Sequence, residues 1–503
     1  MADYKTPGVY IVEKNAFPSS AVAVPTAVPV FIGYTEKAER KTKDLTYVTT
    51  KISSMMEYAE LFGGAFKTKF IVSKIPSSPV DQSEETFNCN GQNLFIKFKP
   101  NNELYFFNAI RLFYLNGGSE CYILSVGNYD HATANGIAAT DFFGTDDNKN
   151  VFKILEKEWE PTLIVLPDVA AKKPTATDAG AYEFYMQALQ HCNITQSRFG
   201  IFDVARSVDG SHDDAIDLFR EKMVSPALKY GAAYYPWLKT VVVDESEIDF
   251  NNLEDSMATL KNIIPPTETV AVTLVNNMAT APTAALQFHQ SLLAASLTYK
   301  QLMAAIRTKL NLLPPSAAMA GIYTAVDNTR GVWKAHANVA VSSVTAPEVN
   351  ISSQQQELMN VDAVSGKSIN IIRTFPGIGT LVWGARTLDG NSQDWKYINV
   401  RRTMIFIEQS LKLATRSFVF EPNNANTWIT VKSMLNNFLF NLWKQGALAG
   451  STPEDAYSVQ VGLGVTMTAT DVLDGIMRIT VLLAVVRPAE FIEITFQQQQ
   501  QKA

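Results

Sequence analysis

The sequence has 503 residues, of which 47% are hydrophobic and 18% are charged. This length exceeds what one hydrophobic core usually supports, so we expect an ordered chain of about two to four domains. The 43 basic and 49 acidic residues give a formal net charge of -6, and no run of Lys and Arg with interleaved aromatic residues occurs. The charge balance therefore argues against a protein that binds nucleic acid directly.

Cysteine usage and apolar stretches bound the class of protein further. The three cysteines, Cys89, Cys121 and Cys192, are widely spaced and odd in number. This pattern disfavours a disulfide framework or a zinc site and favours synthesis in a reducing compartment. The N-terminal stretch carries charged residues where a signal peptide needs an uninterrupted apolar core. The apolar stretch 476–486 is shorter than the roughly 18 to 20 residues of a membrane span, so we expect a soluble protein without membrane insertion.

The first segments predict an arm followed by a buried strand. Gly8 to Val12 is a short β-rich segment, and the Pro-, Ser- and Ala-rich stretch that follows has too little apolar surface for a core of its own. Residues 1–29 are therefore predicted to form an N-terminal arm. Val30 to Tyr34 is a continuous apolar run, which is typical of a buried strand.

Residues 30–149 are predicted to form an α+β region with a surface insertion at about 65–103. The insertion is polar and rich in Pro and Asn, with one strand expected at 94–98. Residues 103–116 have apolar side chains at helical spacing and end at two glycines. Residues 121–126 form another apolar run of the buried type.

Residues 150–370 alternate between short apolar strands and helices. Strands are expected at 162–167, 199–204 and 231–237, and helices at 178–192, 213–223 and 283–312. Residues 251–281 are expected to be an irregular excursion on the surface. The alternation predicts an α/β domain with a mostly parallel sheet.

Residues 371–488 are predicted to form a C-terminal domain. Its first part, 373–409, carries consistent strand, turn, strand and helix signals and no recurring catalytic group, which indicates a well-specified structural unit. The helix that follows places Glu408, Lys412 and Arg416 on one face. A second helix is expected at 427–445, buried through Trp428, Val431, Leu435, Phe438, Leu439 and Leu442.

The chain ends in an alternating apolar segment, Phe491 to Phe496, within a predicted C-terminal arm at 489–503. A terminal strand with no hairpin neighbour must pair with a distant part of its own sheet or with another chain. The two possibilities apply to both ends of this sequence.

No pattern of residues points to a catalytic, cofactor-binding or metal site. The segment 366–368 resembles the end of a phosphate-binding loop, but the required first glycine is replaced by Val361. The five histidines lack the spacing of metal ligands. Ser316 lacks the flanking glycines of a nucleophile elbow. We therefore predict no enzyme activity, no cofactor and no metal.

A series of segments over nearly the whole chain matches one family in the order of that family. They are TPGVYIVE at 6–13, TAVPVFIGYTEKA at 26–38, LFYLNGGSECYILSV at 112–126, YYPWLK at 234–239, PPSAAMAGIY at 314–323, RGVWKAHANV at 330–339, INIIRTFPGIGTLVWGARTL at 369–388, YINVRRTMIFIEQSL at 397–411, FEPNNANTW at 420–428, NFLFNLWKQGALAG at 437–450 and VRPAEFIEITF at 486–496. Through them the chain resembles the contractile tail sheath proteins of contractile-tailed phages, R-type pyocins and phage-tail-like injection particles.

The resemblance implies a fold class and a set of contact residues. It implies an α/β and α+β multidomain protein with a subtilisin-like α/β middle domain that lacks protease chemistry. It also implies terminal arms that exchange strands with neighbouring subunits, through Gly8, Val9, Tyr10, Ile11, Val12, Phe491, Ile492, Glu493, Ile494, Thr495 and Phe496. Because the C-terminal domain of the family faces an inner tube, the candidate tube contacts are Arg401, Arg402, Lys412, Lys432 and Lys444.

The resemblance also implies a function. Sheath subunits stack as rings around the tube, and contraction drives the tube through a target envelope without a nucleotide. The implied partners are further copies in sixfold rings, the inner tube protein, baseplate and terminal cap proteins, and other sheath isoforms. The implied localisation is assembly in the bacterial cytoplasm and release as part of a particle or virion tail.

Three alternatives remain at this stage. One is a phage tail sheath that serves DNA delivery, and another is a sheath of an intracellular secretion machine, which is typically split between two shorter chains. The third is a degenerate serine hydrolase, which would need a nucleophile and a base that the sequence does not supply. The start of the chain is most similar to the extracellular phage-tail-like particles.

Overall fold

The computed structural model describes residues 23–75, 86–144, 146–207, 212–280 and 284–493. The described residues form two compact units. The larger unit is drawn from Pro25–Arg402 and the segment after Arg487, and the smaller unit from Val24 and Thr403–Arg487. The chain therefore passes between the units at 24/25, 402/403 and 487/488.

A nine-stranded sheet forms the centre of the larger unit, in the order β14-β17-β16-β11-β10-β9-β1-β8-β4. The strands are β1 (Pro29–Thr35), β4 (Thr50–Ile52), β8 (Cys121–Asn128), β9 (Leu163–Val165), β10 (Phe199–Asp203), β11 (Gly231–Tyr235), β14 (Val339–Ala340), β16 (Ile369–Phe375) and β17 (Gly379–Val382). The six strands from β16 to β8 run parallel, and antiparallel strands close both edges. The prediction of a mostly parallel sheet is confirmed.

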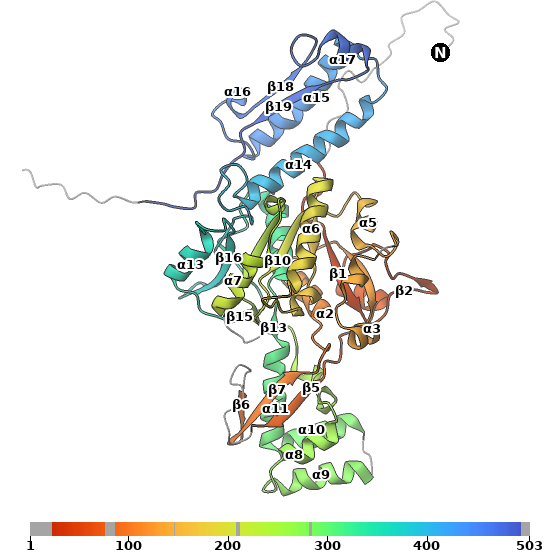
Figure 1. The fold of residues 1–503 in the computed structure, drawn as a ribbon, viewed down its shortest axis with the longest axis vertical. Helices are drawn as coiled ribbons and strands as arrows, with labels where there is room; N and C mark the ends of the chain where they lie inside the picture. The colour runs from red at the N-terminus through yellow and green to blue at the C-terminus, as the bar shows by residue number, and fades with distance from the viewer. Residues whose placement is uncertain (1–22, 76–85, 145, 208–211, 281–283, 494–503) are drawn as a thin grey trace, which may run out of the picture. The chain divides into compact units, whose positions relative to one another are not determined.

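Helices cover both faces of this sheet, which explains why its strands are continuous apolar runs. All seven residues of β1 are buried. On one face Phe31 of β1 packs edge-on against Phe113 of α2 (Phe106–Leu115), with ring centroids 5.1 Å apart, and α12 (Ser316–Arg330) lies beside α2. On the other face Phe202 of β10 stacks on Tyr185 of α6 (Ala181–Thr195) at 4.7 Å. Figure 1 shows α6 in front of the sheet.

Shorter elements complete the larger unit. They are α1 (Met55–Phe62), α3 (Tyr129–Asn135), α4 (Ala139–Phe142), α5 (Val151–Glu156), α7 (His212–Lys222), α13 (Ser353–Asn360), the hairpin of β2 (Glu39–Arg40) and β3 (Lys43–Asp44), and a small sheet of β12 (Leu238–Thr240), β13 (Leu312–Leu313) and β15 (Val344–Pro347). Short 3-10 helices lie at Asp168–Ala171, Leu228–Tyr230, Glu245–Glu247 and Phe250–Asn252.

The sheet extends across the boundaries that we predicted at 149/150 and 370/371. Strands β1 and β8 come from the predicted N-terminal region, yet β1 pairs with β9. Strand β16 continues the same sheet by pairing with β11. A buried parallel strand needs hydrogen-bond partners on both edges, and β1 obtains its second partner only from beyond residue 150.

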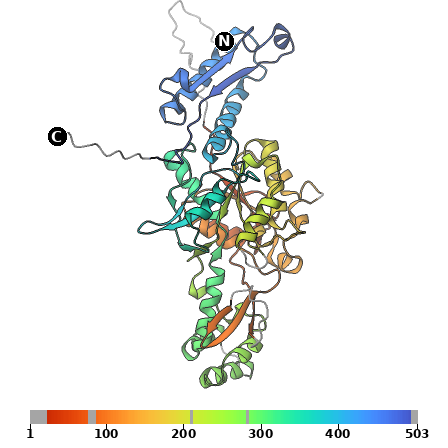
Figure 2. The same cartoon turned by 60° about the vertical axis from the view of Figure 1, so that its left-hand side comes forward.

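A second hydrophobic core joins the predicted insertion to a distant segment. The insertion forms an antiparallel sheet of β5 (Phe70–Lys74), β7 (Gln92–Phe98) and β6 (Thr86–Cys89). Four helices share its core, namely α8 (Ser256–Ile263), α9 (Thr269–Thr280), α10 (Ala285–Ala295) and α11 (Leu297–Leu310). Figure 2 shows this group of strands and helices from the side.

Two expectations for this region were therefore wrong. Much of the predicted irregular excursion at 251–281 is helical, and the single helix expected at 283–312 is two helices separated at Ser296. The Ser296 hydroxyl accepts the Tyr299 N–H at 2.9 Å and begins α11 as an N-cap. The apolar face of a three-stranded sheet is stable only when it is buried, and these helices bury it.

The smaller unit consists of helices and a β-hairpin. Its elements are most of α14 (Ile398–Thr415), a short 3-10 helix (Arg416–Phe418), α15 (Ala425–Lys444), α16 (Pro453–Ala456), β18 (Tyr457–Val461), α17 (Ala469–Leu473) and β19 (Ile479–Leu483). Figure 1 shows them in blue. The predicted helix at 427–445 is confirmed within two residues at its start and one at its end. All of its predicted apolar stripe is buried except Trp428, which is half-buried.

Candidate interaction surfaces

The carboxyl ends of the parallel strands are the usual ligand-binding edge of such a sheet, where the strand order reverses. Here β8 lies on one side of β1 and β9 on the other. Asp168, which follows β9, lies at this point and accepts backbone N–H groups from Tyr34, Tyr105 and Phe106 at 2.7 to 2.9 Å. Burial raises the pKa of Asp168 to about 6, against the opposing effect of these three donors. The chain's own backbone therefore occupies the position where a ligand would bind.

A second buried aspartate ends β10. Asp203 accepts both the N–H and the hydroxyl hydrogen of Ser316, at 2.7 and 2.6 Å. Burial raises the pKa of Asp203 to about 7. Because Ser316 is the first residue of α12, the aspartate caps that helix. Both side chains are buried, and among the described residues no hydrogen bond joins Ser316 to a histidine, so the geometry is that of a helix cap.

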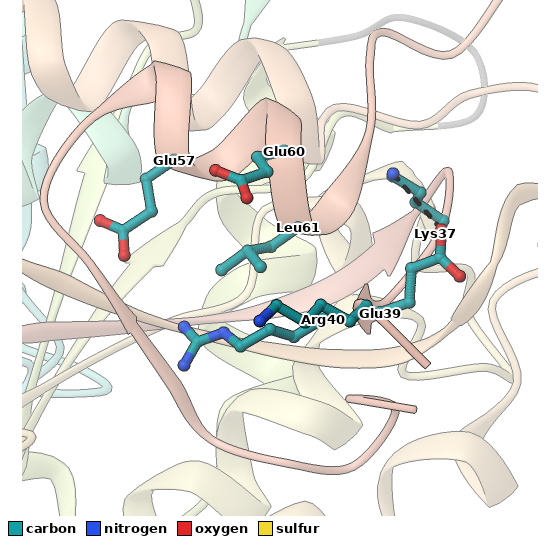
Figure 3. Close-up of a pocket in the computed structure, with 7 residues that line it drawn as sticks. Lys37, Glu39, Arg40, Glu57, Glu60 and Leu61 are labelled. Carbon is teal, nitrogen blue, oxygen red and sulfur yellow. Dashed lines mark ion pairs between the residues drawn. The ribbon is translucent and has the colours of Figure 1, made fainter. Parts of the chain in front are cut away.

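A cleft beside α1 carries both signs of charge. It has a volume of about 520 Å³ and lies between the β2–β3 hairpin and α1. Figure 3 shows Lys37, Glu39 and Arg40 on one side and Glu57 and Glu60 on the other. Lys37 pairs with Glu39 at 3.4 Å, and both side chains are about half exposed. Such solvated pairs contribute little free energy, so this cleft is a charged surface and not a built ligand site.

Two of the predicted tube contacts are core residues. Arg401 and Arg402 are each only 3% exposed. The Arg401 guanidinium lies 4.4 Å from the Trp395 ring, and Arg402 forms an ion pair with Asp327 at 2.7 Å. The prediction for these two arginines is corrected, because partners that are distant in the sequence bury the start of α14. The other three predicted contacts, Lys412, Lys432 and Lys444, are exposed on α14 and α15.

The buried ion pair of Arg402 is the centre of a cluster. Arg402 donates to both carboxylate oxygens of Asp327, at 3.1 Å from Nη1 and 2.7 Å from Nη2. His336 places Nε2 2.7 Å from Oδ1 of Asp327, and its ring stacks on Tyr323 with centroids 4.1 Å apart. Burial alone would raise the pKa of Asp327, but the charge of Arg402 and the bond from His336 bring it down to about 2. Arg402 also donates to the Thr26 carbonyl oxygen at 2.9 Å.

A second ion pair holds the start of the predicted C-terminal arm. Glu490 accepts hydrogen bonds from Arg386 at 2.7 Å, from Asn360 at 2.7 Å and from the Tyr397 hydroxyl at 3.0 Å. Burial acts to raise the pKa of Glu490, and the bonds from Arg386 and Asn360 outweigh it and lower the pKa. We did not predict Glu490, because nothing local in the sequence distinguishes it from Glu493.

The predicted strand-exchange residues lie mostly outside the described part of the chain. This applies to Gly8, Val9, Tyr10, Ile11, Val12, Ile494, Thr495 and Phe496. Phe491, Ile492 and Glu493 are described and do not lie in a strand. Phe491 and Ile492 are 76% and 80% exposed, so these two apolar side chains have no cover within the described chain.

The β-hairpin of the smaller unit has open edges. Strands β18 and β19 pair with each other in a two-stranded antiparallel sheet. Within the described residues no third strand pairs with either outer edge along Tyr457–Val461 or Ile479–Leu483. An isolated hairpin is marginally stable, and its free N–H and C=O groups are a template for a further strand.

Clusters of metal ligands and membrane-spanning helices are absent from the described ranges. These ranges contain no group of three or more His, Cys, Asp or Glu residues that could hold a metal ion. No helix among them is both long enough and apolar enough to span a bilayer.

The known proteins that this chain resembles are tail sheath proteins. Residues 391–499 match the phage tail sheath C-terminal domain. The chain is 28% identical over 140 residues to the tail sheath protein of Burkholderia phage BcepMu, a match that covers 27% of this chain and 29% of the phage protein. It is 28% identical to a chain of the PVC sheath complex of an extracellular contractile injection system in the contracted state, over 99% of each chain and with a TM-score of 0.59. The chain is thus similar over its whole length to a contractile sheath protein, and its C-terminal part matches the phage tail sheath family.

The likeness of this chain to solved sheath structures extends over both compact units. The helical sheath of the anti-feeding prophage in its contracted state is 28% identical, over 99% of this chain and 100% of that chain, with a TM-score of 0.59. A chain of the baseplate of the same particle is 29% identical at the same coverage, with a TM-score of 0.58. The mixed α/β multidomain fold of this chain thus matches that of solved contractile sheaths.

Proposed function

We propose that this sheath protein polymerises as stacked sixfold rings around an inner tube and that contraction of the polymer drives the tube through a target envelope. The likeness to two contractile sheaths over 99% of the chain supports this proposal most strongly. The particle would be a phage-tail-like extracellular injection system, assembled in the bacterial cytoplasm and then released. The baseplate, a terminal cap protein and other sheath isoforms are further proposed partners.

The energy for contraction would come from the interfaces between subunits. Burial of apolar surface stabilises a contact by about 25 cal/mol per Å², so a lattice that buries more surface is lower in free energy. A ring assembly with two alternative packings can store this difference and release it when the baseplate triggers the change. The proposal requires no nucleotide. The buried Asp168 and Asp203 at the edge of the sheet accept the first N–H groups of α2 and α12, so they act as helix caps.

Electron microscopy of the polymer tests this proposal directly. The sheath protein would be co-expressed with a tube protein and a baseplate and imaged before and after triggering. We expect tubular polymers in a long and a short form, with the tube protruding from the short form. Discrete particles of one or a few copies, with no tubular polymer under any condition, would contradict the proposal.

We further propose that neighbouring subunits exchange terminal strands and that β18 and β19 accept them. The open edges of this hairpin support the assignment. The exposure of Phe491 and Ile492 supports the assignment too, because these two apolar side chains are not buried by the described part of the chain and could pack against a neighbouring subunit. Each added strand of about six residues would form several hydrogen bonds of roughly 0.5 to 1.5 kcal/mol each, which tethers neighbours while the lattice changes.

We also propose that the parallel sheet of the larger unit is a subtilisin-like domain without protease chemistry. The hydrogen bond from the buried Ser316 hydroxyl to Asp203 supports the second half of this proposal, since that serine is withdrawn from solvent. A fluorophosphonate probe for reactive serines is expected to leave the folded protein unlabelled. Labelling at Ser316 would instead favour the degenerate hydrolase.

The three exposed lysines are our proposed contacts with the tube. Replacing Lys412, Lys432 and Lys444 together with glutamate is expected to weaken tube binding about 3- to 160-fold, because exposed charge pairs contribute about 0.2 to 1 kcal/mol each. The loss should shrink as salt is added. Co-sedimentation with polymerised tube over a range of salt concentrations measures both effects.

A matched control for this experiment is Lys261→Glu, which makes the same change at an exposed lysine on α8 of the larger unit. This control is expected to sediment with the tube as the natural chain does. If the triple variant also binds the tube normally, the three lysines do not face it.

A further inference from the structure

We propose that two ion pairs, the partly buried Arg386–Glu490 and the buried Arg402–Asp327, are positioning clamps that fix the roots of the two terminal arms to the central sheet. Tension on an exchanged arm would then act on the sheet of the larger unit and not on the coil that precedes the arm. The inference rests on the proposed strand exchange for its purpose, but the clamps themselves can be tested on the single chain.

The C-terminal root is held at one residue. The Glu490 side chain is 19% exposed and that of Arg386 is 6% exposed. Arg386 donates from Nε at 2.9 Å to one carboxylate oxygen and from Nη2 at 2.7 Å to the other. This two-pronged geometry is the strongest form of such a pair and resists rotation of the carboxylate. Directly after it, Phe491 is 76% exposed, so the arm leaves the surface immediately beyond the clamp.

The clamp continues into the sheet through buried hydrogen bonds. The Arg386 backbone donates to Oδ1 of Asn370 at 2.8 Å and accepts from Nδ2 of Asn370 at 2.8 Å. Nδ2 of Asn370 also donates to the Ala233 carbonyl oxygen at 3.1 Å. Asn370 lies in β16 and is fully buried, and Ala233 lies in β11. Glu490 is therefore connected to two central strands through Arg386 and Asn370.

The N-terminal root is held in the same manner just before β1. The Thr26 carbonyl oxygen accepts from Nη2 of Arg402 at 2.9 Å and from the Thr162 hydroxyl at 2.7 Å. The Thr162 oxygen in turn accepts the Val28 N–H at 2.9 Å. Thr162 precedes β9, the neighbour of β1 in the sheet. Arg402 can hold Thr26 because Asp327 holds Arg402.

The clamps lie where the chain passes between the two compact units. Thr26 is two residues from the passage at 24/25, Arg402 is the last residue before the passage at 402/403, and Glu490 is the third residue after the passage at 487/488. Each passage of the chain is thus tied to the larger unit within three residues. Any change in the arrangement of the smaller unit would leave the arm roots in place, since the clamps lie wholly in the larger unit.

The test compares Glu490→Gln with a charge-swap variant that combines Arg386→Glu with Glu490→Arg. Glu490→Gln removes the charge but keeps the size. It is expected to speed chymotrypsin cleavage after Phe491 about tenfold, because a protease cuts the detached form of a segment and the weaker pair lets residue 490 detach more often. The swap is expected to recover part of that protection. Glu493→Gln, at an exposed glutamate on the same arm, is the matched control and is expected to leave the rates unchanged.

Thermal unfolding separates a clamp from a general contribution to stability. We expect Glu490→Gln to keep the melting temperature of the full chain within a few degrees while cleavage after Phe491 becomes faster. Equal cleavage rates in Glu490→Gln and the natural chain would overturn the proposal, and so would an equal rise in cleavage at sites throughout the larger unit.

The assembled particle gives the second readout. Sheaths of Glu490→Gln are expected to form and then to break into short pieces on contraction, because an unclamped arm root yields under tension. Intact contraction would overturn the role of the clamp under tension. If the natural chain forms no sheath at all, the proposed function fails, whereas the cleavage measurement on the single chain still decides whether the clamp exists.

Discussion

Replacing Asp327 with asparagine is expected to lower the free energy of unfolding by about 3 to 5 kcal/mol, the usual cost of breaking a buried ion pair from one side. The Asp327 and Arg402 side chains are 1% and 3% exposed, so the variant would leave a buried guanidinium without its counter-charge. His336 would lose its charged acceptor in the same step. Urea unfolding followed by circular dichroism measures the change.

Two further variants separate the causes of that loss. Asp474→Asn makes the same chemical change at an exposed aspartate and is expected to have almost no effect. The double variant that combines Asp327→Leu with Arg402→Met removes both charges, and it is expected to be more stable than Asp327→Asn because no unpaired charge remains buried. A loss below about 1 kcal/mol in Asp327→Asn would show that water or another group compensates Arg402.

Removing residues 491–503 is expected to abolish long sheaths while the single chain stays folded. The truncation deletes the proposed exchange strand but keeps Glu490 and its bonds to Arg386, Asn360 and Tyr397. Each subunit would lose several backbone hydrogen bonds to a neighbour, worth roughly 0.5 to 1.5 kcal/mol each, and a polymer multiplies this loss at every contact. Sedimentation of polymer and electron microscopy measure sheath length.

The control for this truncation is a shorter one that removes only residues 497–503. It keeps Phe491 to Phe496, so sheaths of normal length are expected. If the longer truncation also forms normal sheaths, the C-terminal strand is not exchanged. If the single chain loses its circular dichroism signal, the segment completes the chain's own fold, which is the alternative that the strand pattern left open.

Elements with strong local signals could be predicted from the sequence. The helix α15 has its apolar side chains at helical spacing and a capping asparagine, Asn424, which accepts two N–H groups of the first turn. The apolar runs that became β1, β8 and β10 are the buried strands of the central sheet. The family resemblance was also available, because its segments are spread over the whole length of the chain.

Partnerships between distant residues could not be predicted in this way. Arg401 and Arg402 begin an amphipathic helix and were interpreted as surface residues, yet Asp327 and the Trp395 ring bury them. In the sequence alone, an acidic residue that forms a buried ion pair looks the same as an acidic residue on the surface. Only the folded structure shows which basic residue lies beside it. The cost of burying an unpaired charge makes such a partner obligatory, but it does not say which residue it is.

The sequence by itself determined the types of the strongest elements and the lack of a recognisable catalytic motif, because these depend on local periodicity, spacing and composition. It also carried the resemblance to tail sheath proteins, through segments that match in order. Only the tertiary structure decided that one sheet runs through three predicted regions and that residues 70–98 share a core with residues 243–310. It also decided that Glu490 and Arg402 hold the arm roots. These features depend on apolar contacts, hydrogen bonds and ion pairs between residues that are far apart in the sequence, from 75 positions for Arg402 and Asp327 to 376 for Arg402 and Thr26. Such pairing is a property of the folded chain as a whole.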